Sequence, residues 1–264
     1  MRFCWFTTGE DKQAFALLKD VHKATEEEVI DGEIALVFMN RERGETPDSD
    51  DIMAFAETRG IPLESVSSRK FVEEQGQTSD EARALFDALV KEKIEKYDFD
   101  SIFLAGYVPI LSPMLFEHFC VFNLHSSLPG TYEGKRDKVI ARTIKDGKRV
   151  FGAMVHGVDA SLAAGPPLSF VKLVLEGRGF EELYNNVYRG DMSSFDHLFK
   201  FMREAECAAE APLVVETLSS LSRGVINITG RRVCFNDEPV SGGVDMTDRV
   251  LASLRTKSGL LPEE

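Results

Sequence analysis

Short apolar blocks alternate with amphipathic stretches along the first half of the chain. The block at 33–40 is apolar almost throughout, which is typical of a strand buried on both faces of a sheet. The stretches between the blocks have the apolar spacing of helices; one ends at Gly60 before Pro62, and another begins after Ser79, a residue type that caps helices. We therefore expect strands at 1–6, 33–40, 63–67, 101–107 and 121–125, and helices at 13–23, 51–60, 80–89 and 113–118.

The pattern changes near residue 138. A helix at 138–146 precedes two apolar blocks at 150–158 and 166–177, whose short connection favours antiparallel or mixed pairing. A long helix at 194–221 follows, then a hairpin at 224–235 that turns at Thr229 and Gly230. The residues after Ser241 predict a last helix with a loose acidic tail.

Taken together, these elements predict an α/β fold. We expect a Rossmann-like, mostly parallel twisted sheet with helices on both faces, continuing into a mixed or antiparallel C-terminal part. The expected domain covers residues 1–240, with a parallel half at 1–135 and a second half at 136–240, and an extension at 241–264 follows it.

A polar pair ends the apolar block at 121–125. Asn123 and His125 lie two residues apart just before a turn rich in proline and glycine, so on a strand their side chains point to the same face. The carboxyl ends of parallel strands are where such sheets bind ligands. An amide donor beside an imidazole suits a reaction that develops an oxyanion and moves a proton, such as acyl transfer. An asparagine that caps the turn beside a structural histidine would explain the same pair.

Composition narrows the function classes. The formal net charge is −13, which argues against a nucleic-acid partner because such a partner requires a basic surface. We see no secretory leader and no apolar run of about 18 or more residues, so we expect a cytoplasmic protein without a membrane partner. The four cysteines lack metal-ligand spacing; we expect no metal site, and we expect Cys4 and Cys120 to be buried as small apolar residues.

Five short motifs follow one another between residues 104 and 134. They are Leu104-Ala105-Gly106-Tyr107, Ile110-Leu111-Ser112-Pro113, Asn123-Leu124-His125, Ser127-Leu128-Pro129 and Tyr132-Glu133-Gly134. Their order, spacing and content resemble the folate-dependent formyltransferase family, most nearly its members that formylate glycinamide ribonucleotide in purine synthesis. A weaker resemblance extends over residues 1–238 and is specific again only at 152–168.

This resemblance implies an activity and a set of site residues. The co-substrate would be 10-formyltetrahydrofolate, whose formyl carbon is attacked by a primary amine. Asn123 would donate to the developing oxyanion, and His125 would assist with the proton and the charge. The folate would lie in a pocket whose walls are the backbone of Val108, Pro109, Ile110 and Leu111 and the loop from Val158 to Ala163.

The chain departs from the family at its third catalytic group. The family has an Asp in a Leu-Asp-Gly-Gly-Pro-like loop, whereas this chain has Ala163 at that position. Asp159 lies four residues earlier and would supply a carboxylate if the loop is re-formed, although a solvated turn residue would explain it as well.

The amine side of the family's site also differs. The family's first loop, Ser-Gly-x-Gly-Ser-Asn, holds a phosphate, but the corresponding loop here contains Gly9, Glu10 and Asp11, whose two carboxylates would repel one. Arg69 or Lys70 would be the displaced substitutes for a family arginine. Glu206, on the late helix, matches weakly a family glutamate near the substrate amine.

We therefore expect a formyltransferase that acts on glycinamide ribonucleotide or on a divergent primary amine. Two alternatives stay open: a non-catalytic or regulatory folate-binding relative, and a hydrolase of formyltetrahydrofolate in which water replaces the amine. The expected partners are folate and a small-molecule amine, and a homodimer is left open.

Overall fold

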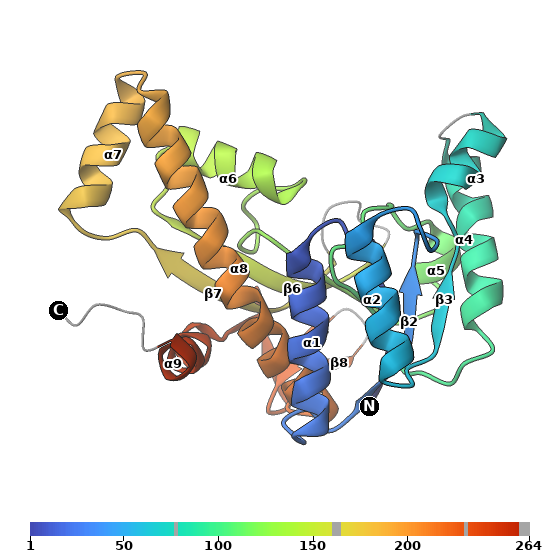
Figure 1. Ribbon diagram of the computed structural model, residues 1–264. Coiled ribbons are helices and arrows are strands. Elements are labelled where there is room, and N and C mark those ends of the chain that lie inside the picture. The colour runs from blue at the N-terminus through green and yellow to red at the C-terminus, as the bar shows by residue number, and fades with distance from the viewer. Residues whose placement is uncertain (77–78, 160–164, 230–231, 259–264) are drawn as a thin grey trace. The chain divides into compact units, whose positions relative to one another are not determined.

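The computed structural model describes residues 1–76, 79–159, 165–229 and 232–258 (Figure 1). The chain divides into two compact units. The first comprises Met1–Leu124 and Gly157–Gly165, and the second comprises His125–His156 and Pro166–Glu264. The predicted domain of residues 1–240 with its extension remains a prediction. None of the described helices is both long and apolar enough to cross a membrane.

The first unit contains a parallel sheet with the strand order β3-β2-β1-β4-β5. Each strand pair is joined through at least one helix, which is the connection that parallel strands require. The predicted parallel α/β fold is thereby confirmed. The elements are β1 (Arg2–Thr7), α1 (Lys12–Glu26), β2 (Glu33–Met39), α2 (Pro47–Thr58), β3 (Leu63–Ser65), α3 (Ser68–Gln75), α4 (Asp80–Ile94), β4 (Ser101–Leu104), α5 (Pro113–Phe116) and β5 (Val121–His125).

Helices cover this sheet because its strands are apolar on both faces. On one face, alternate side chains of β1, β2 and β4 form one apolar cluster with residues of α4 and α5, including Phe6, Phe38 and Phe86. α1 and α2 lie side by side, with Phe15 against Phe55 at 5.6 Å between ring centroids (Figure 1). The predicted cap at Ser79 is confirmed, since its hydroxyl accepts the Ala82 N–H at 3.1 Å.

The second unit is built on antiparallel pairs and a long helix. β6 pairs with β7 antiparallel, β11 adds to β7 in parallel, and β8, β9 and β10 form a separate antiparallel sheet, which confirms the mixed C-terminal part. α8 packs against α6, α7 and α9. The elements are α6 (Arg136–Lys145), β6 (Val150–Gly157), β7 (Pro167–Val174), α7 (Arg178–Tyr188), α8 (Met192–Ser222), β8 (Ile226–Thr229), β9 (Arg232–Phe235), β10 (Glu238–Val240), β11 (Val244–Asp245) and α9 (Thr247–Ser258).

Several local expectations need correction. β4 ends at Leu104, three residues earlier than expected, because the chain turns at Gly106 with a φ of 68°. Cys120 is exposed, since it precedes β5 instead of lying within it, whereas Cys4 is buried as expected. The helices α3 and α7 were not expected. Of the predicted hairpin turn, Gly230 lies outside the described residues.

A buried carboxyl group holds the segment between β4 and α5. Asp87, on α4, accepts the backbone N–H of Ser112, the residue before α5. Burial raises the pKa of Asp87, and its hydrogen bonds from Ser112 oppose that rise. Removing the acceptor would leave a buried backbone N–H without a partner.

We expect Asp87→Ala to lower the free energy of unfolding by about 1–3 kcal/mol, the usual cost of an unsatisfied buried polar group. Asp87→Asn keeps an acceptor oxygen of the same shape and serves as the control, with a smaller loss expected. Urea unfolding followed by circular dichroism measures both. An alanine variant as stable as the asparagine variant would contradict this role for Asp87.

Candidate functional site

Thr8 joins three segments at the carboxyl edge of the parallel sheet. Its hydroxyl donates to Asn40 Oδ1 at 2.6 Å, beyond the end of β2, and accepts the Val108 N–H at 2.9 Å, beyond the end of β4. The Thr8 N–H donates to the Gly106 carbonyl at 3.2 Å. The predicted substrate loop after β1 and the predicted folate wall after β4 are therefore neighbours, which is where parallel sheets place ligands.

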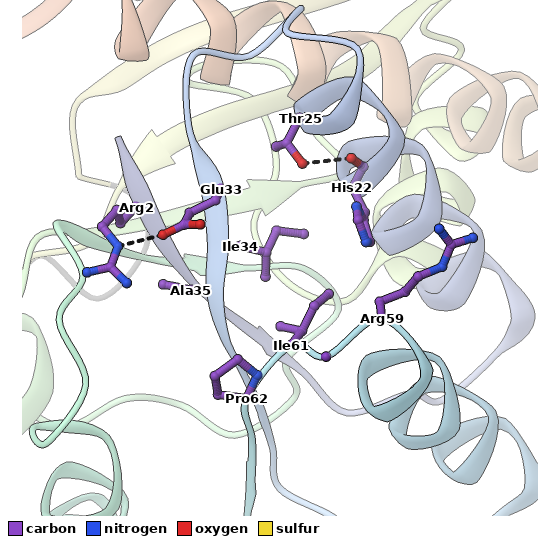
Figure 2. Close-up of a pocket in the computed structure, with 10 residues that line it drawn as sticks. Arg2, His22, Thr25, Glu33, Ile34, Ala35, Arg59, Ile61 and Pro62 are labelled. Carbon is purple, nitrogen blue, oxygen red and sulfur yellow. Dashed lines mark hydrogen bonds and ion pairs between the residues drawn. The ribbon is translucent and has the colours of Figure 1, made fainter.

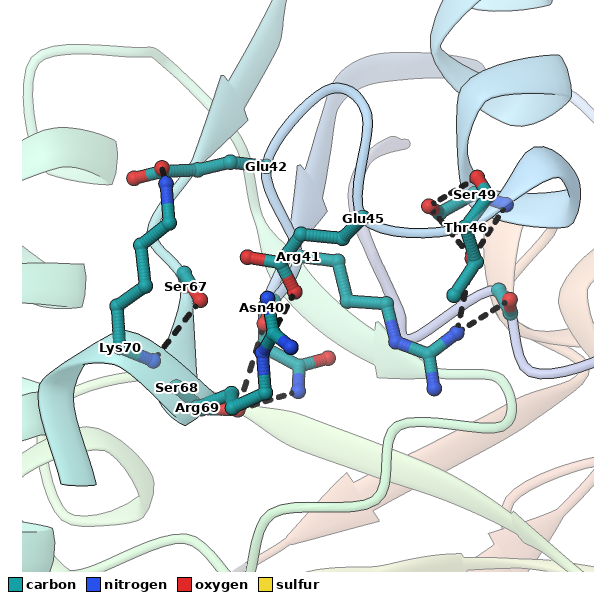
Figure 3. Close-up of polar contacts among 11 residues, drawn as sticks. Asn40, Arg41, Glu42, Glu45, Thr46, Ser49, Ser67, Ser68, Arg69 and Lys70 are labelled. Atoms are coloured by element: carbon teal, nitrogen blue, oxygen red, sulfur yellow. Dashed lines mark hydrogen bonds and ion pairs between the residues drawn. The ribbon is translucent and has the colours of Figure 1, made fainter. Parts of the chain in front are cut away.

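Charged side chains gather beside this link, and oppositely charged groups face one another (Figure 3). Lys70 Nζ lies 2.6 Å from Glu42 Oε2, and Arg69 Nε lies 3.9 Å from Glu45 Oε2. Arg41 Nη1 donates to the Gly9 carbonyl and to Thr46 Oγ1, each at 3.1 Å. The basic groups drawn here thus already face carboxylate, carbonyl or hydroxyl oxygens of the protein.

The predicted substrate loop is closed by its own hydrogen bonds. Gly9 has a φ of 64° and donates its N–H to Thr7 Oγ1 at 3.3 Å. Asp11 caps α1, with its carboxylate accepting the Ala14 N–H at 3.1 Å. A carboxylate at the start of a helix compensates the positive end of the helix dipole. In this chain an acidic side chain of the protein therefore occupies the anion-binding end of α1, beside Glu10, which is exposed.

The predicted folate wall combines anchored and exposed residues. Val108 is 40% exposed and Ile110 is 61% exposed, on either side of Pro109, whereas Leu111 is buried in the apolar cluster under the sheet. Val158 packs against the same cluster and donates its N–H to the Val121 carbonyl at 2.9 Å. Leu111 and Val158, one residue from each predicted folate segment, therefore lie at one apolar cluster of the first unit. Ala163 lies outside the described residues.

Asp159 lies where the two ends of its loop meet. A Cβ atom added to Gly165 would lie 2.3 Å from the Gly157 carbonyl oxygen and 3.4 Å from Asp159 Cγ. Only glycine allows that approach of the two backbone segments. The carboxylate of Asp159 therefore lies beside Gly165, where the two described segments that flank residues 160–164 approach each other.

Asn123 and His125 both lie on β5, as predicted, two residues apart on one strand. Asn123 pairs with Leu104 of β4 and so belongs to the carboxyl edge of the parallel sheet. His125 Nε2 lies 3.2 Å from the Tyr132 carbonyl oxygen. Because a carbonyl only accepts, Nε2 carries the proton of the neutral ring and Nδ1 carries the lone pair.

Burial sets the charge of this histidine. It lowers the pKa of His125 below its ordinary value, and the hydrogen bond to Tyr132 and the charge of Glu133 oppose that shift. The ring of His156, which is buried, lies edge-on at 6.0 Å between ring centroids. His125 is accordingly a neutral imidazole near pH 7, able to accept a proton at Nδ1.

Two glutamates on α8 are buried in the second unit, and both are 1% exposed. Glu210 forms an ion pair with Arg136 of α6, and its Oε1 lies 3.4 Å from Ser126 Oγ. Glu206 is one turn earlier, and its Oε2 has no hydrogen-bond partner. Burial, together with the charge of Glu210, raises the pKa of Glu206 to about 9, although Arg136 opposes the rise. Glu206 is therefore protonated at neutral pH.

Sequence reasoning named Asn123, His125 and Glu206 but missed Thr8, Arg136 and Glu210. Arg136 lies in a run of charged residues, which is usually a solvated surface. Glu206 and Glu210 are four residues apart and interspersed with alanines, and that apolar setting was the available signal for buried carboxylates.

The described residues also form a cavity away from the carboxyl edge of the parallel sheet. A cavity of about 280 Å³ in the first unit is lined by residues at the starts of β1 and β2, where Arg2 Nε donates to Glu33 Oε1 at 2.8 Å (Figure 2). It opens at the amino ends of the strands, away from the edge that carries Thr8. Within the described residues no group of three or more His, Cys, Asp or Glu side chains is placed to hold a metal ion.

Comparisons with known proteins identify a matching family model and several similar solved structures. The family model described as formyl transferase matches residues 1–193. The phosphoribosylglycinamide formyltransferase of Coxiella burnetii has a TM-score of 0.68 and 20% identity, covering 93% of this chain and 98% of its own. Glycinamide ribonucleotide transformylase 1 of Symbiobacterium toebii has a TM-score of 0.66 and 21% identity, covering 89% and 93%.

A formyltetrahydrofolate deformylase from Pseudomonas putida KT2440 is similar as well, with a TM-score of 0.62 and 16% identity, covering 89% of this chain and 69% of its own. At such identities these structures establish the fold. No curated protein sequence matches the chain.

The buried carboxyl of Glu206 predicts a pH dependence of stability. The folded protein keeps the Glu206 proton up to a pKa of about 9, whereas the unfolded chain loses it near the ordinary value of 4.5. Stability from this group is therefore complete below pH 4.5 and is lost as the pH rises towards 9, by up to about 1.4 kcal/mol per pH unit. We expect Glu206→Gln to remove that slope and to be more stable than the wild type at pH 8.

Urea unfolding at pH 5 and pH 8 measures this difference. Glu204→Gln is the matched control, because Glu204 lies on the same helix with its side chain 67% exposed. Equal slopes for the wild type and Glu206→Gln would show that Glu206 is not a buried acid.

Proposed function

The chain belongs to the formyl transferase family, and from that premise we propose that it transfers a formyl group from 10-formyltetrahydrofolate to a primary amine. The observation that carries the proposal is the pair on β5: an asparagine at the carboxyl edge of a parallel sheet, followed two residues later by a neutral histidine. Both are the residue types that the reaction requires, and the family match includes them.

The reaction needs one oxyanion site and one proton carrier. The amine nitrogen attacks the formyl carbon, and the C–O double bond becomes a C–O⁻ single bond. The Asn123 amide donates a hydrogen bond to that oxygen. His125 accepts the proton that the attacking nitrogen loses, at Nδ1, and returns it to N10 of the folate as the C–N10 bond breaks. The products are the formylated amine and tetrahydrofolate, so atoms and charge balance. Oxyanion stabilisation and acid–base catalysis are usually the main terms in acyl transfer.

The folate would bind to the first unit. Val108, Pro109, Ile110 and Leu111 would form one wall, and Val158 with the following loop to Ala163 would form the other. The exposed apolar side chain of Ile110 supports this assignment, as does the link that fixes the Val108 backbone to Thr8. Asp159 is the proposed third acid–base group, because it is the carboxylate that the loop offers in place of the family's Asp.

The acceptor amine would not be a phosphate ester. Asp11 already occupies the start of α1, Glu10 adds a second negative charge, and Arg41, Arg69 and Lys70 face oxygens of the protein. A phosphate at this loop would meet two carboxylates, whose charge Lys12 offsets only in part. Within the proposed function, we place Gly9, Glu10 and Asp11 beside an uncharged or cationic part of the acceptor, and Glu206 on the amine side in the second unit.

The activity is tested by replacing the oxyanion donor. We expect Asn123→Ala to lower kcat for formyl transfer by about 10²–10³-fold, the usual effect of losing such a donor, with the Kd for 10-formyltetrahydrofolate changed less than twofold. Asn227→Ala, in the antiparallel sheet of the second unit, is the control. Formation of tetrahydrofolate is followed by absorbance, and folate binding by calorimetry.

Two outcomes would decide against the transferase. A wild-type protein that binds the folate but releases no formyl group would be a non-catalytic relative. Release of formate at the same rate with and without amines would identify a hydrolase.

The acceptor class is tested with an amine offered with and without a phosphate, such as glycinamide ribonucleoside and its nucleotide. We expect the wild type to have the higher kcat/KM for the unphosphorylated form. Asp11→Ser keeps a helix cap but removes the charge, and it should raise the relative kcat/KM of the phosphate ester about fivefold, corresponding to about 1 kcal/mol.

Asp191→Ser removes the same charge from the cap of α8 and should leave that ratio unchanged. A wild-type preference of more than tenfold for the phosphate ester would refute the proposed acceptor class.

A further inference from the structure

The turn that follows His125 is held by its own hydrogen bonds. Ser127 donates its N–H to the His125 carbonyl at 2.9 Å, and its hydroxyl accepts the Tyr132 N–H at 3.1 Å. The hydroxyls of Ser127 and Thr131 lie 2.7 Å apart. Together these contacts bring the Tyr132 carbonyl to Nε2 of His125, so the shape of the turn decides which ring nitrogen carries the proton.

The Arg136 side chain, from outside the turn, forms a hydrogen bond with Ser126, the residue that follows His125. Arg136, the first residue of α6, donates from Nε to Ser126 Oγ at 3.0 Å. Its Nη2 pairs with the buried Glu210, and its Nη1 lies 3.6 Å from Cys207 Sγ. Because each of the three guanidinium nitrogens has a different partner, the planar group has one orientation.

Separating Arg136 from Glu210 would be energetically costly. Glu210 is 1% exposed, so moving Arg136 away would leave a buried carboxylate without its cation. The Ser126 hydroxyl lies within 3.4 Å of the same carboxylate oxygen, which adds a second reason for the hydroxyl to stay in place. The position of Ser126 is thus fixed by a charge that must remain compensated.

We propose that Arg136 is a positioning residue for His125: through Ser126 it holds the turn in the shape that keeps the proton on Nε2 and the lone pair on Nδ1. A lysine would keep the charge opposite Glu210. It could not also keep the separate contact to Ser126, because its ammonium group has one nitrogen where the guanidinium has three. The consequence for turnover rests on the proposed function, whereas the positioning is a property of the second unit alone.

The chain supplies a matched control. Arg203 of α8 pairs with Asp137 of α6 at 2.6 Å from Nη1 to Oδ1, so it bridges the same two helices as Arg136 and Glu210. That contact lies on the exposed side and involves no residue of the turn. Loss of helix docking would affect both arginines, whereas loss of positioning is specific to Arg136.

The test follows the imidazole nitrogens of His125 by two-dimensional NMR in the 15N-labelled full chain. We expect separate Nδ1 and Nε2 signals typical of one tautomer in the wild type and in Arg203→Lys. In Arg136→Lys and in Ser126→Ala we expect the two signals to move towards each other, because the ring then samples both tautomers. Ser126→Ala keeps the ion pair and therefore covers the case in which Arg136→Lys does not fold.

The outcomes separate this inference from the proposed function. Imidazole signals in Ser126→Ala that match those of Arg203→Lys would overturn the positioning role, whatever the activity. If formyl transfer occurs, Arg136→Lys should also lower kcat by about ten- to a hundredfold with little change in KM for the folate, as expected for a displaced catalytic group. Signals that move as expected in a protein without formyl transfer would uphold the positioning and refute the reaction.

Discussion

The negative charge of Glu210, buried in the second unit, determines how the side chains around it are placed and which of them carry a proton. An isolated carboxylate at 1% exposure would cost several kcal/mol, so Arg136 has to face it. Once Arg136 faces Glu210, its Nε fixes Ser126, and the turn after His125 follows. Glu206, one helical turn away, keeps its proton, because burial disfavours its charged form and the charge of Glu210 raises its pKa further. The tautomer of a single histidine thus depends on a charge that solvent does not reach.

In the first unit, charged side chains at the edge of the sheet compensate one another. Its sheet edge carries several charged groups close together, but they face one another: Glu42 faces Lys70, and Glu45 faces Arg69. Asp11 meets the helix dipole of α1 in the same way. Because these charges compensate one another, selection of a ligand beside them would rest on shape and on hydrogen bonds more than on attraction of an anion.

Sequence patterns were most informative for the strands of the parallel sheet. β5 has the predicted bounds, because a strand inside a parallel sheet is recognised by its apolar run and its polar end. The helices α3 and α7 were missed although the apolar residues of α7 recur at helical spacing; both helices are mostly exposed, since α3 has no buried residue and α7 buries only Tyr184.

For the site, the sequence indicated the candidate catalytic side chains but not the residues that position them. Asn123 and His125 share a strand, so their spacing is visible in the sequence. Arg136 and Glu210 are 74 residues apart and meet only because α6 packs on α8. Contacts of that kind depend on helix packing, which no local pattern contains. Thr8 was missed for the same reason, because its partners Asn40 and Val108 follow different strands.

Three hydrogen bonds at the edge of the first unit form a chain that runs in one direction. The Val108 N–H donates to Thr8, the Thr8 hydroxyl to Asn40 Oδ1, and Asn40 Nδ2 to Ser68 Oγ at 2.9 Å. The Ser68 hydroxyl then donates to the Asn40 carbonyl at 3.3 Å. Both hydroxyl protons are therefore already used, and what these oxygens have left is lone pairs. A ligand group that reaches either hydroxyl oxygen must therefore bring its own N–H or O–H, because a bare acceptor finds no hydroxyl proton there.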